Sequence, residues 1–380
     1  MFASLVFYLL MTTLALYVRA KFHAPASVAG LAVGIYVLGA LIGRLFTGKY
    51  IELAGRRKTL YFGGMTFFLA SLLYLIPVGL PLLLAMRFLH GVTFGIIGTA
   101  LPAIAVSSIP DERKGEGVGF FTLSNTIATA IGPFTGAYVL EHYHYGAIFI
   151  TCSAFAFCTL LVVLFMNAAD LAGNRRGDAA CAASGFRFSA FFERAAIPVS
   201  LVILPVGMCY ATVTSFLTAY AEHDGLPGIV PVYFIVYSAF ILIGRPLTGK
   251  ILDRRGDNAA MIPPLISASV SLVALAFARS MPAFLASAAL MAFGLGTLVS
   301  CGQAIAVKMS PGERIGTATS TYMSFSDTGL GIGPVLMGLI IPRKGYRGMF
   351  LVASVIIALD LLLYILVHGR KTGYNKGKAR

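Results

Sequence analysis

Charged residues are scarce in this sequence: Asp, Glu, Lys and Arg make up 12% of its 380 residues, about half the share of a typical soluble domain. No polar segment is long enough to form a soluble enzyme beside a membrane anchor. Apolar residues reach 58%, too many for a soluble fold, because folding hides only about 75% of the surface even at roughly 300 residues. The composition therefore indicates a polytopic membrane protein.

Cysteine is sparse as well, and its placement excludes two further classes. The five cysteines form no CxxC pair and four lie within apolar runs, so neither a disulfide framework nor a zinc site is expected. Glu141, His142 and His144 share a short loop, which is a weak metal signal. We expect no metal site, no cofactor and, because catalytic groups are not clustered, no enzyme activity.

Long continuous apolar runs replace the alternation of apolar and polar residues that a transmembrane β-barrel needs. Such runs predict helices, because lipid leaves each segment to satisfy its own backbone hydrogen bonds. About 20 residues suffice for one span. The fold class expected is an all-α polytopic membrane protein with twelve transmembrane helices, at about 2–18, 27–48, 59–78, 80–107, 116–140, 145–167, 196–220, 229–249, 260–278, 281–307, 315–341 and 346–367.

The twelve runs form two similar halves. A shift of 201 residues places Ile42-Gly43-Arg44 on Ile243-Gly244-Arg245 and Gly132-Pro133 on Gly333-Pro334. Two repeated halves predict two pseudo-symmetric six-helix bundles, as in secondary transporters, with a site between the halves near mid-membrane. The expected domains are an N-terminal half (1–167), a cytoplasmic central loop (168–195), a C-terminal half (196–368) and a basic cytoplasmic tail (369–380).

Basic residues outnumber acidic ones by 29 to 15, which in a soluble protein would suggest nucleic acid. Here they lie in short loops, so no nucleic-acid partner is expected. If both termini are cytoplasmic, the inside loops and tail hold 20 Lys and Arg and the outside loops six. The positive-inside rule therefore predicts cytoplasmic termini, with the tail against anionic lipid.

The loop from Gly48 to Lys58 resembles the signature G-x-x-x-D-x-x-G-R-[KR] of the major facilitator superfamily, with Glu52 where the family usually has Asp. Its echo runs from Gly249 to Gly256. The resemblance covers essentially the whole chain and implies a monomeric secondary transporter of the bacterial inner membrane. It also implies a gating latch, for which a purely topogenic basic loop is the alternative. The latch residues expected are Gly48, Glu52, Gly55, Arg56, Arg57, Arg44, Gly249, Asp253 and Arg245.

The segment from Ala128 to Ala137 partly matches the antiporter-associated pattern G-x-x-x-G-P-x-x-G-G. In the family this pattern goes with exporters, and physically it allows a bent helix to pack closely on a neighbour. An ordinary packing kink is the alternative. The helix-packing residues expected are Gly132, Pro133, Gly136, Gly333 and Pro334.

Few charges lie inside the predicted spans. Arg87 with His90 looks like the family element R-x-x-x-G, which is linked to proton coupling; an arginine that snorkels to the outer surface is the alternative. Asp327 lies at mid-depth on a polar stripe and is expected to couple protons or orient substrate. Asp360 is expected to be a packing or hydrogen-bonding group. In the family the first, fourth, seventh and tenth spans line the cavity. Further substrate or coupling candidates are Tyr8, Thr12, Asn125, Tyr210, Thr214 and Gln303.

The function expected is proton-coupled efflux of a small amphipathic organic solute by alternating access. Alternatives are an importer or sugar-efflux-like facilitator, and an exporter of metallophore-type metabolites. A transporter-derived sensor would need an added soluble domain. The expected partners are a small-molecule substrate, protons and the lipid bilayer. Because only 16 residues precede Tyr17, against 25 in the apolar run before Tyr220, we expect Met1 to be an internal methionine of a longer natural chain.

Overall fold

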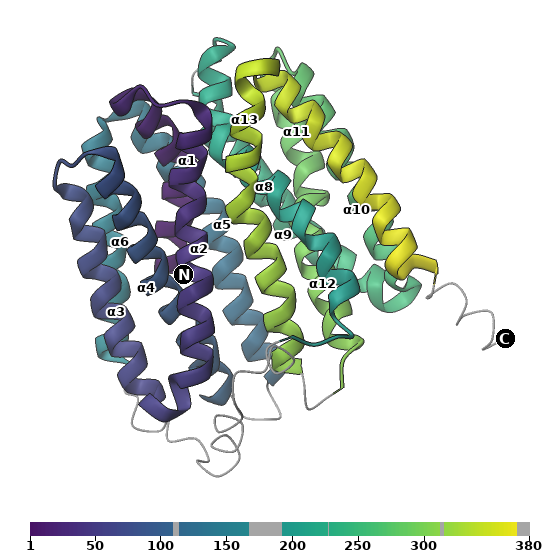
Figure 1. Ribbon diagram of the computed structural model, residues 1–380. Coiled ribbons are helices and arrows are strands. Elements are labelled where there is room, and N and C mark those ends of the chain that lie inside the picture. The colour runs from purple at the N-terminus through teal and green to yellow at the C-terminus, as the bar shows by residue number, and fades with distance from the viewer. Residues whose placement is uncertain (109–113, 167–191, 227, 312–314, 371–380) are drawn as a thin grey trace. The chain divides into compact units, whose positions relative to one another are not determined.

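The computed structural model describes residues 1–108, 114–166, 192–226, 228–311 and 315–370 (Figure 1). These residues form helices and no strands, which confirms the all-α fold class. The helices of the first half are α1 (Phe2–Phe22), α2 (Ala26–Ala54), α3 (Arg56–Leu72) with the short 3₁₀ helix η1 (Leu73–Leu75), α4 (Leu80–Ser108), α5 (Lys114–His142) and α6 (Tyr145–Phe165).

The second half continues the pattern. Its elements are α8 (Ile197–His223), α9 (Ile229–Arg255), α10 (Asp257–Phe277), α11 (Met281–Phe293), α12 (Leu295–Lys308), α13 (Ile315–Tyr364) and the π-helix η6 (Ile365–Gly369). Within α13, Gly345 has φ 67° and a non-helical conformation, so α13 joins the two predicted spans 315–341 and 346–367. α11 and α12 together form one apolar span, interrupted at Gly294.

Ten helical segments in the described residues are long and apolar enough to cross a membrane. One of these contains both spans of α13, and α5, which is not among the ten, covers the predicted fifth span. α1 has 21 residues because the helix continues past Tyr17 to Phe22. The first span is therefore longer than the 16 residues counted before Tyr17, and the expectation that Met1 is an internal methionine stays a prediction.

The chain forms two compact units: Met1–Ala24 with Leu31–Phe186, and Pro25–Gly30 with Arg187–Arg380. In the first unit α1 packs on α5 and α6, and α3 packs on α4 and α6. In the second unit α13 packs along α8 and α10, and α9 packs on α11 (Figure 1). Each unit thus has its own buried helical core.

Glycines set the closest helix contacts in both units. A Cβ on Gly91 of α4 would lie 1.9 Å from the carbonyl oxygen of Tyr36 on α2, so only glycine allows this approach. Gly132 of α5 packs on Tyr8 of α1, where a Cβ would lie 2.6 Å away. Gly333 of α13 approaches the carbonyl oxygen of Met208 on α8, with a Cβ distance of 2.4 Å.

The remaining members of the expected packing set lie on the same helices. Gly136 also faces α1, because a Cβ there would lie 3.0 Å from the carbonyl oxygen of Leu9. Pro133 and Pro334 lie inside α5 and α13 and are buried. The predicted helix-packing residues therefore occupy close contacts within their own units.

The repeat is visible in the backbone as well. Gly55, which precedes α3, has φ 88°, and Gly256, which precedes α10, has φ 85°. These two positions are 201 residues apart in sequence. Glycine adopts such positive φ angles without the steric penalty of a side chain. The same glycine-dependent turn therefore leads into the third helix of each half.

Candidate functional site

A buried cation lies at the centre of the first unit. Arg87 of α4 is 0% exposed. Its Nε donates a hydrogen bond to the carbonyl oxygen of Ala32 at 3.1 Å. Its Cζ lies 4.3 Å from the centroid of the Tyr36 ring, so the guanidinium also makes a cation–π contact. Because the Arg87 side chain is buried within the first unit, it does not extend to a surface of that unit, as the alternative of a snorkelling arginine would require.

Tyr74 of η1 links Arg87 to His90. Arg87 Nη1 donates a long hydrogen bond of 3.5 Å to the Tyr74 hydroxyl, and His90 Nδ1 lies 3.0 Å from the same oxygen. A tyrosine hydroxyl has one proton, which can be given to His90 Nδ1 while the oxygen accepts from Arg87. A neutral His90 in this arrangement carries its own proton on Nε2.

Aromatic rings enclose this group. The His90 ring lies edge-on to Tyr36 at 5.3 Å between centroids and 4.6 Å from the ring of Phe67. Tyr36 also stacks on Phe7 at 5.6 Å. We call Arg87, His90, Tyr74 and Tyr36 the arginine cluster. It joins α2, η1 and α4 through side chains that the glycine contact between Gly91 and Tyr36 brings together.

Three polar atoms of the arginine cluster are buried without a hydrogen-bond partner: Arg87 Nη2, His90 Nε2 and the Tyr36 hydroxyl. Each such group costs about 1–3 kcal/mol relative to a satisfied one. Arg87 also forms no ion pair with a carboxylate in the described part of the chain. Arg87 Nη2 and the Nε2–H of His90 can each donate to an electron-rich oxygen. The cluster is thus suited to a polar or anionic group or to proton transfer.

The other candidates of the first unit have partners elsewhere. The Thr12 hydroxyl donates to the carbonyl oxygen of Tyr8 on its own helix at 3.0 Å. Asn125 of α5 is exposed and accepts a hydrogen bond from Ser4 of α1 at 2.8 Å. Tyr8 is half-buried, with its ring 4.9 Å from that of Phe7. Of the residues predicted in this half, the structure therefore joins Arg87 and His90 directly.

The candidates of the second unit lie on three helices. Thr214 of α8 is buried and donates to the carbonyl oxygen of Tyr210 at 3.1 Å, and the Tyr210 ring stacks on Tyr237 of α9 at 6.1 Å. Gln303 of α12 and Asp327 of α13 are half-buried. The role of these residues stays a prediction.

Four of the nine expected latch residues lie outside the described side chains. This applies to Gly48, Glu52, Arg245 and Asp253, whose helices α2 and α9 are described only as backbone at these positions. The other five latch residues have described positions. Arg57 is exposed and its Nε donates to the Tyr61 hydroxyl at 3.2 Å; Gly55 supplies the turn described above; and Arg44, Arg56 and Gly249 are half-buried.

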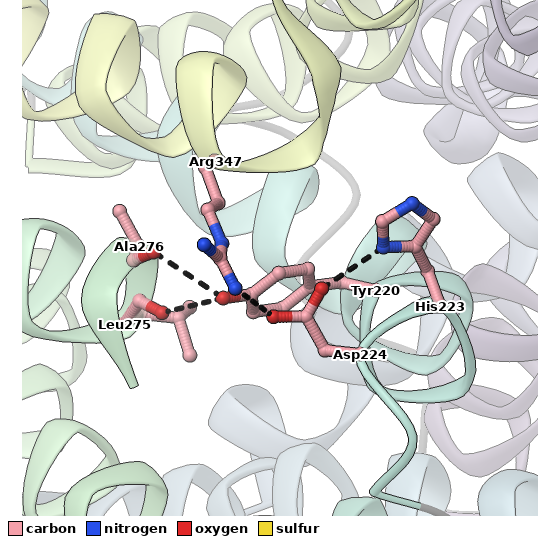
Figure 2. Close-up of polar contacts among 6 residues, drawn as sticks. All are labelled: Tyr220, His223, Asp224, Leu275, Ala276 and Arg347. Atoms are coloured by element: carbon pink, nitrogen blue, oxygen red, sulfur yellow. Dashed lines mark hydrogen bonds and ion pairs between the residues drawn. The ribbon is translucent and has the colours of Figure 1, made fainter. Parts of the chain in front are cut away.

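A second polar group, which the sequence did not predict, lies where α8 ends (Figure 2). Asp224 Oδ2 accepts a 2.6 Å hydrogen bond from Arg347 Nη2, and Asp224 Oδ1 lies 2.9 Å from His223 Nδ1. The Tyr220 hydroxyl beside them donates to the carbonyl oxygens of Leu275 and Ala276 at 3.2 and 3.3 Å (Figure 2). These bonds tie α8, the end of α10 and the bend in α13 together.

The charge of Asp224 is stabilised by this arrangement. Its burial alone would raise the pKa of the carboxyl group. The hydrogen bonds and charges of Arg347 and His223 outweigh burial, so the pKa of Asp224 lies below its usual value. Sequence reasoning missed the pair because its partners are 123 residues apart and each looks like an ordinary loop residue.

Comparisons with known proteins match most of the chain. The sequence profile of the Major Facilitator Superfamily matches residues 1–281 and 236–380. The Multidrug resistance protein MdtG of Dickeya zeae (strain Ech586) is 23% identical, over 98% of this chain and 93% of that protein. The MdtG protein of Enterobacter lignolyticus (strain SCF1) is 24% identical, over 91% of this chain and 83% of that protein.

Solved structures share the fold at low sequence identity. A POT family transporter in complex with a thioalcohol-conjugated peptide superposes with a TM-score of 0.79 at 14% identity, covering 97% of this chain and 94% of that one. A variant of the nucleoside transporter NupG superposes with a TM-score of 0.76 at 11% identity, covering 97% and 98%. At these identities the likeness extends to the fold alone.

Proposed function

Because the chain belongs to the Major Facilitator Superfamily, a family of membrane transporters, we propose that it exports small amphipathic organic solutes in exchange for protons. The observation that carries the proposal is the arginine cluster of the first unit. An arginine at membrane depth is expensive unless it serves a pathway or has a partner. Arg87 has a backbone oxygen and two aromatic residues around it, and no carboxylate.

The unpaired atoms define which solutes suit the site. Arg87 Nη2 offers a charged donor, and the Tyr36 hydroxyl offers a donor and an acceptor. The rings of Tyr36, Phe67 and Phe7 offer apolar faces. A solute with an apolar body and an electron-rich or anionic group matches both features. A multiply charged solute does not, because one fixed cation cannot compensate several charges.

Proton exchange is assigned to His90. Its Nδ1 is held by the Tyr74 hydroxyl, and its Nε2 has no partner. An unperturbed histidine changes protonation near neutral pH, whereas burial and the neighbouring Arg87 charge favour the neutral form of His90 in the closed cluster. A proton would bind at Nδ1 as the Tyr74 hydroxyl turns away, because Nε2 already carries the proton of the neutral imidazole. Solute and proton would then use the same cluster, and exchange requires that they occupy it alternately.

The outward direction rests on two supports. Gly132 and Gly136 of α5 pack directly on α1, in the segment that resembles the antiporter pattern. Two of the relatives are named multidrug resistance proteins. Export also fits the expected topology, with cytoplasmic termini in the bacterial inner membrane, because the inward proton gradient there can drive solute out.

The test is gradient-driven flux in proteoliposomes of known protein orientation. The solutes are one cationic, one neutral and one anionic amphipathic fluorophore. We expect the neutral or anionic probe to move against its gradient when protons flow the opposite way, and Arg87→Met to abolish this movement. The control is Arg279→Met, which removes an exposed arginine. Solute and protons moving in the same direction would identify an importer and refute the proposal.

A further inference from the structure

The second half of α13 carries a carboxyl group in an unusual environment. Asp360 is 2% exposed, and neither of its carboxyl oxygens has a hydrogen-bond partner among the residues that the structure describes. Buried polar groups in proteins are nearly always hydrogen-bonded, and buried charges are nearly always paired. The burial of Asp360 fits the expectation of a packing group, whereas a hydrogen bond, the other role expected for it, is not found among the described residues.

Within the described ranges, no cationic side chain forms an ion pair with Asp360. The titratable groups in electrostatic range are the Cys209 thiol of α8 and the Tyr322 hydroxyl of the first half of α13. Cys209 Sγ donates to the carbonyl oxygen of Ala353 at 3.5 Å, and Tyr322 donates to that of Leu298 on α12 at 3.2 Å. Both groups are neutral donors already engaged elsewhere. The surroundings thus suit a protonated, uncharged Asp360.

The same face of α13 leads from Asp360 to one end of the unit. Tyr364 and His368 follow at intervals of four residues, so the three side chains stack along one side of the helix. All three are buried. Asp360 and Tyr364 are separated by about 6 Å along the axis, at 1.5 Å per residue, and the ring centroids of Tyr364 and His368 lie 5.6 Å apart. One bridging water molecule, with a hydrogen bond of about 2.8 Å on either side, can span such a step.

Beyond Asp360 the stack is hydrogen-bonded to α10 and reaches the surface. The Tyr364 hydroxyl donates to Asn258 Oδ1 at 2.9 Å. His368 Nε2 lies 3.0 Å from Asp257 Oδ2. Asp257 Oδ1 accepts a 3.1 Å hydrogen bond from Lys308 of α12, whose side chain is 65% exposed. Asp257 is the only titratable residue of α10. The first two residues of α10, Asp257 and Asn258, make its hydrogen bonds to the stack.

We propose that Asp360 is a proton-exchange site of the second unit, reached from the Asp257–Lys308 surface through His368 and Tyr364. A proton from water binds at the His368–Asp257 pair and is accepted by the Tyr364 oxygen as the hydroxyl proton leaves Asn258. That hydroxyl proton passes through a bridging water molecule to the Asp360 carboxylate, which becomes the acid, and the reverse path returns it to water. Proton binding at Asp360 stands independently of transport. Its role in driving solute rests on the proposed function.

Infrared spectroscopy of the purified full chain tests proton binding. At neutral pH we expect a carboxylic-acid carbonyl band that disappears in Asp360→Asn and shifts in frequency in Asp360→Glu. Asp224→Asn is the matched control, because Asp224 is ionised and salt-bridged and its removal leaves the acid band unchanged. If the wild-type chain has no acid band sensitive to either change at Asp360, the proposal is overturned.

Hydrogen–deuterium exchange of the same band tests the route, and it does not depend on the Asn variant folding. In deuterated buffer the band shifts as the acid proton exchanges. We expect His368→Gln to keep the band but slow its exchange by roughly a hundredfold, the lower range for loss of a positioned acid–base group. An unchanged exchange rate would overturn the route through His368.

Flux measurements separate this inference from the proposed function. If solute flux through the wild-type chain does not respond to the pH gradient while the Asp360 acid band persists, the proposed function is contradicted and proton binding at Asp360 is not. If the wild type is gradient-driven, we expect Asp360→Asn to lose gradient-driven accumulation while retaining solute exchange at equal pH. Gradient-driven accumulation that survives in Asp360→Asn overturns the role of Asp360 in coupling.

Discussion

Replacing Arg87 with methionine is expected to stop transport while changing the stability of the first unit only slightly. A charged arginine at the centre of a membrane helix costs about 2.5–3.5 kcal/mol on insertion scales, which is an upper value for Arg87 because it lies near the start of α4. Its charged hydrogen bond to Ala32 contributes about 1.5–3 kcal/mol. Its desolvated contact with the Tyr36 ring contributes about 2 kcal/mol. These opposing terms nearly cancel, and methionine fills the space with a flexible apolar chain.

The remaining contacts of the cluster support a small effect. Tyr74 keeps its interaction with His90 in the variant. The Ala32 carbonyl lies within α2, where it also accepts the regular helical bond. We therefore expect a net change of about 1 kcal/mol, which corresponds to roughly 2–4 °C for a unit of this size.

Thermal unfolding is measured with a thiol-reactive dye, because Cys152 of the first unit is fully buried in the folded chain. Flux of the anionic fluorophore is measured on the same preparation, with Arg279→Met as the control. A fall in the unfolding midpoint of more than roughly 10 °C would show that Arg87 holds the fold together. Undiminished flux in Arg87→Met would remove the cluster from the transport pathway.

Three further predictions concern other parts of the chain. Arg347→Gln should lower the unfolding midpoint at neutral pH. The pKa of Asp224 is lowered in the folded chain, so the stability that the Asp224–Arg347 pair contributes is fully present above the ordinary pKa of about 3.9. It is lost as the pH falls through the pKa that Asp224 has in the folded chain. An unfolding midpoint that Arg347→Gln leaves unchanged at pH 7 contradicts this prediction. Asp327→Asn should abolish gradient-driven flux with solute binding retained, and unchanged flux and pH dependence would leave it a packing residue. Glu52→Gln with Asp253→Asn should cut transport and raise cysteine labelling from the cytoplasmic side, whereas wild-type transport would leave only a topogenic loop.

The helices and their repeat were predictable from local sequence. Apolar runs determine where a chain can span lipid, because every backbone group in a span must be satisfied within it. The positive φ of Gly55 and Gly256 follows from a glycine recurring at the same place in both halves. Arg87 was predictable as a site candidate for a similar local reason, since a lone cation in an apolar run stands out.

The partners of charged residues were not predictable. Asp224 and Arg347 form their hydrogen bond because the end of α8 lies beside the bend of α13, and no local sequence pattern reveals this arrangement. Asp360 looked like a residue with a hydrogen-bonding role, and the absence of a partner emerges only once α8 and α10 are placed around it. The four-residue spacing of Asp360, Tyr364 and His368 indicates that they share one side of the helix. The contact between His368 and Asp257 depends on how α10 packs in the folded chain, which the spacing does not reveal.

The most direct test of the central claim is solute-driven proton movement in proteoliposomes that enclose a pH-sensitive dye. An outward gradient of the anionic amphipathic solute is imposed with no initial pH difference. If solute and protons move in opposite directions through this chain, the lumen should acidify as solute leaves, and Arg87→Met should abolish the acidification. Solute leaving through the wild-type chain with no change in luminal pH would contradict proton-coupled export.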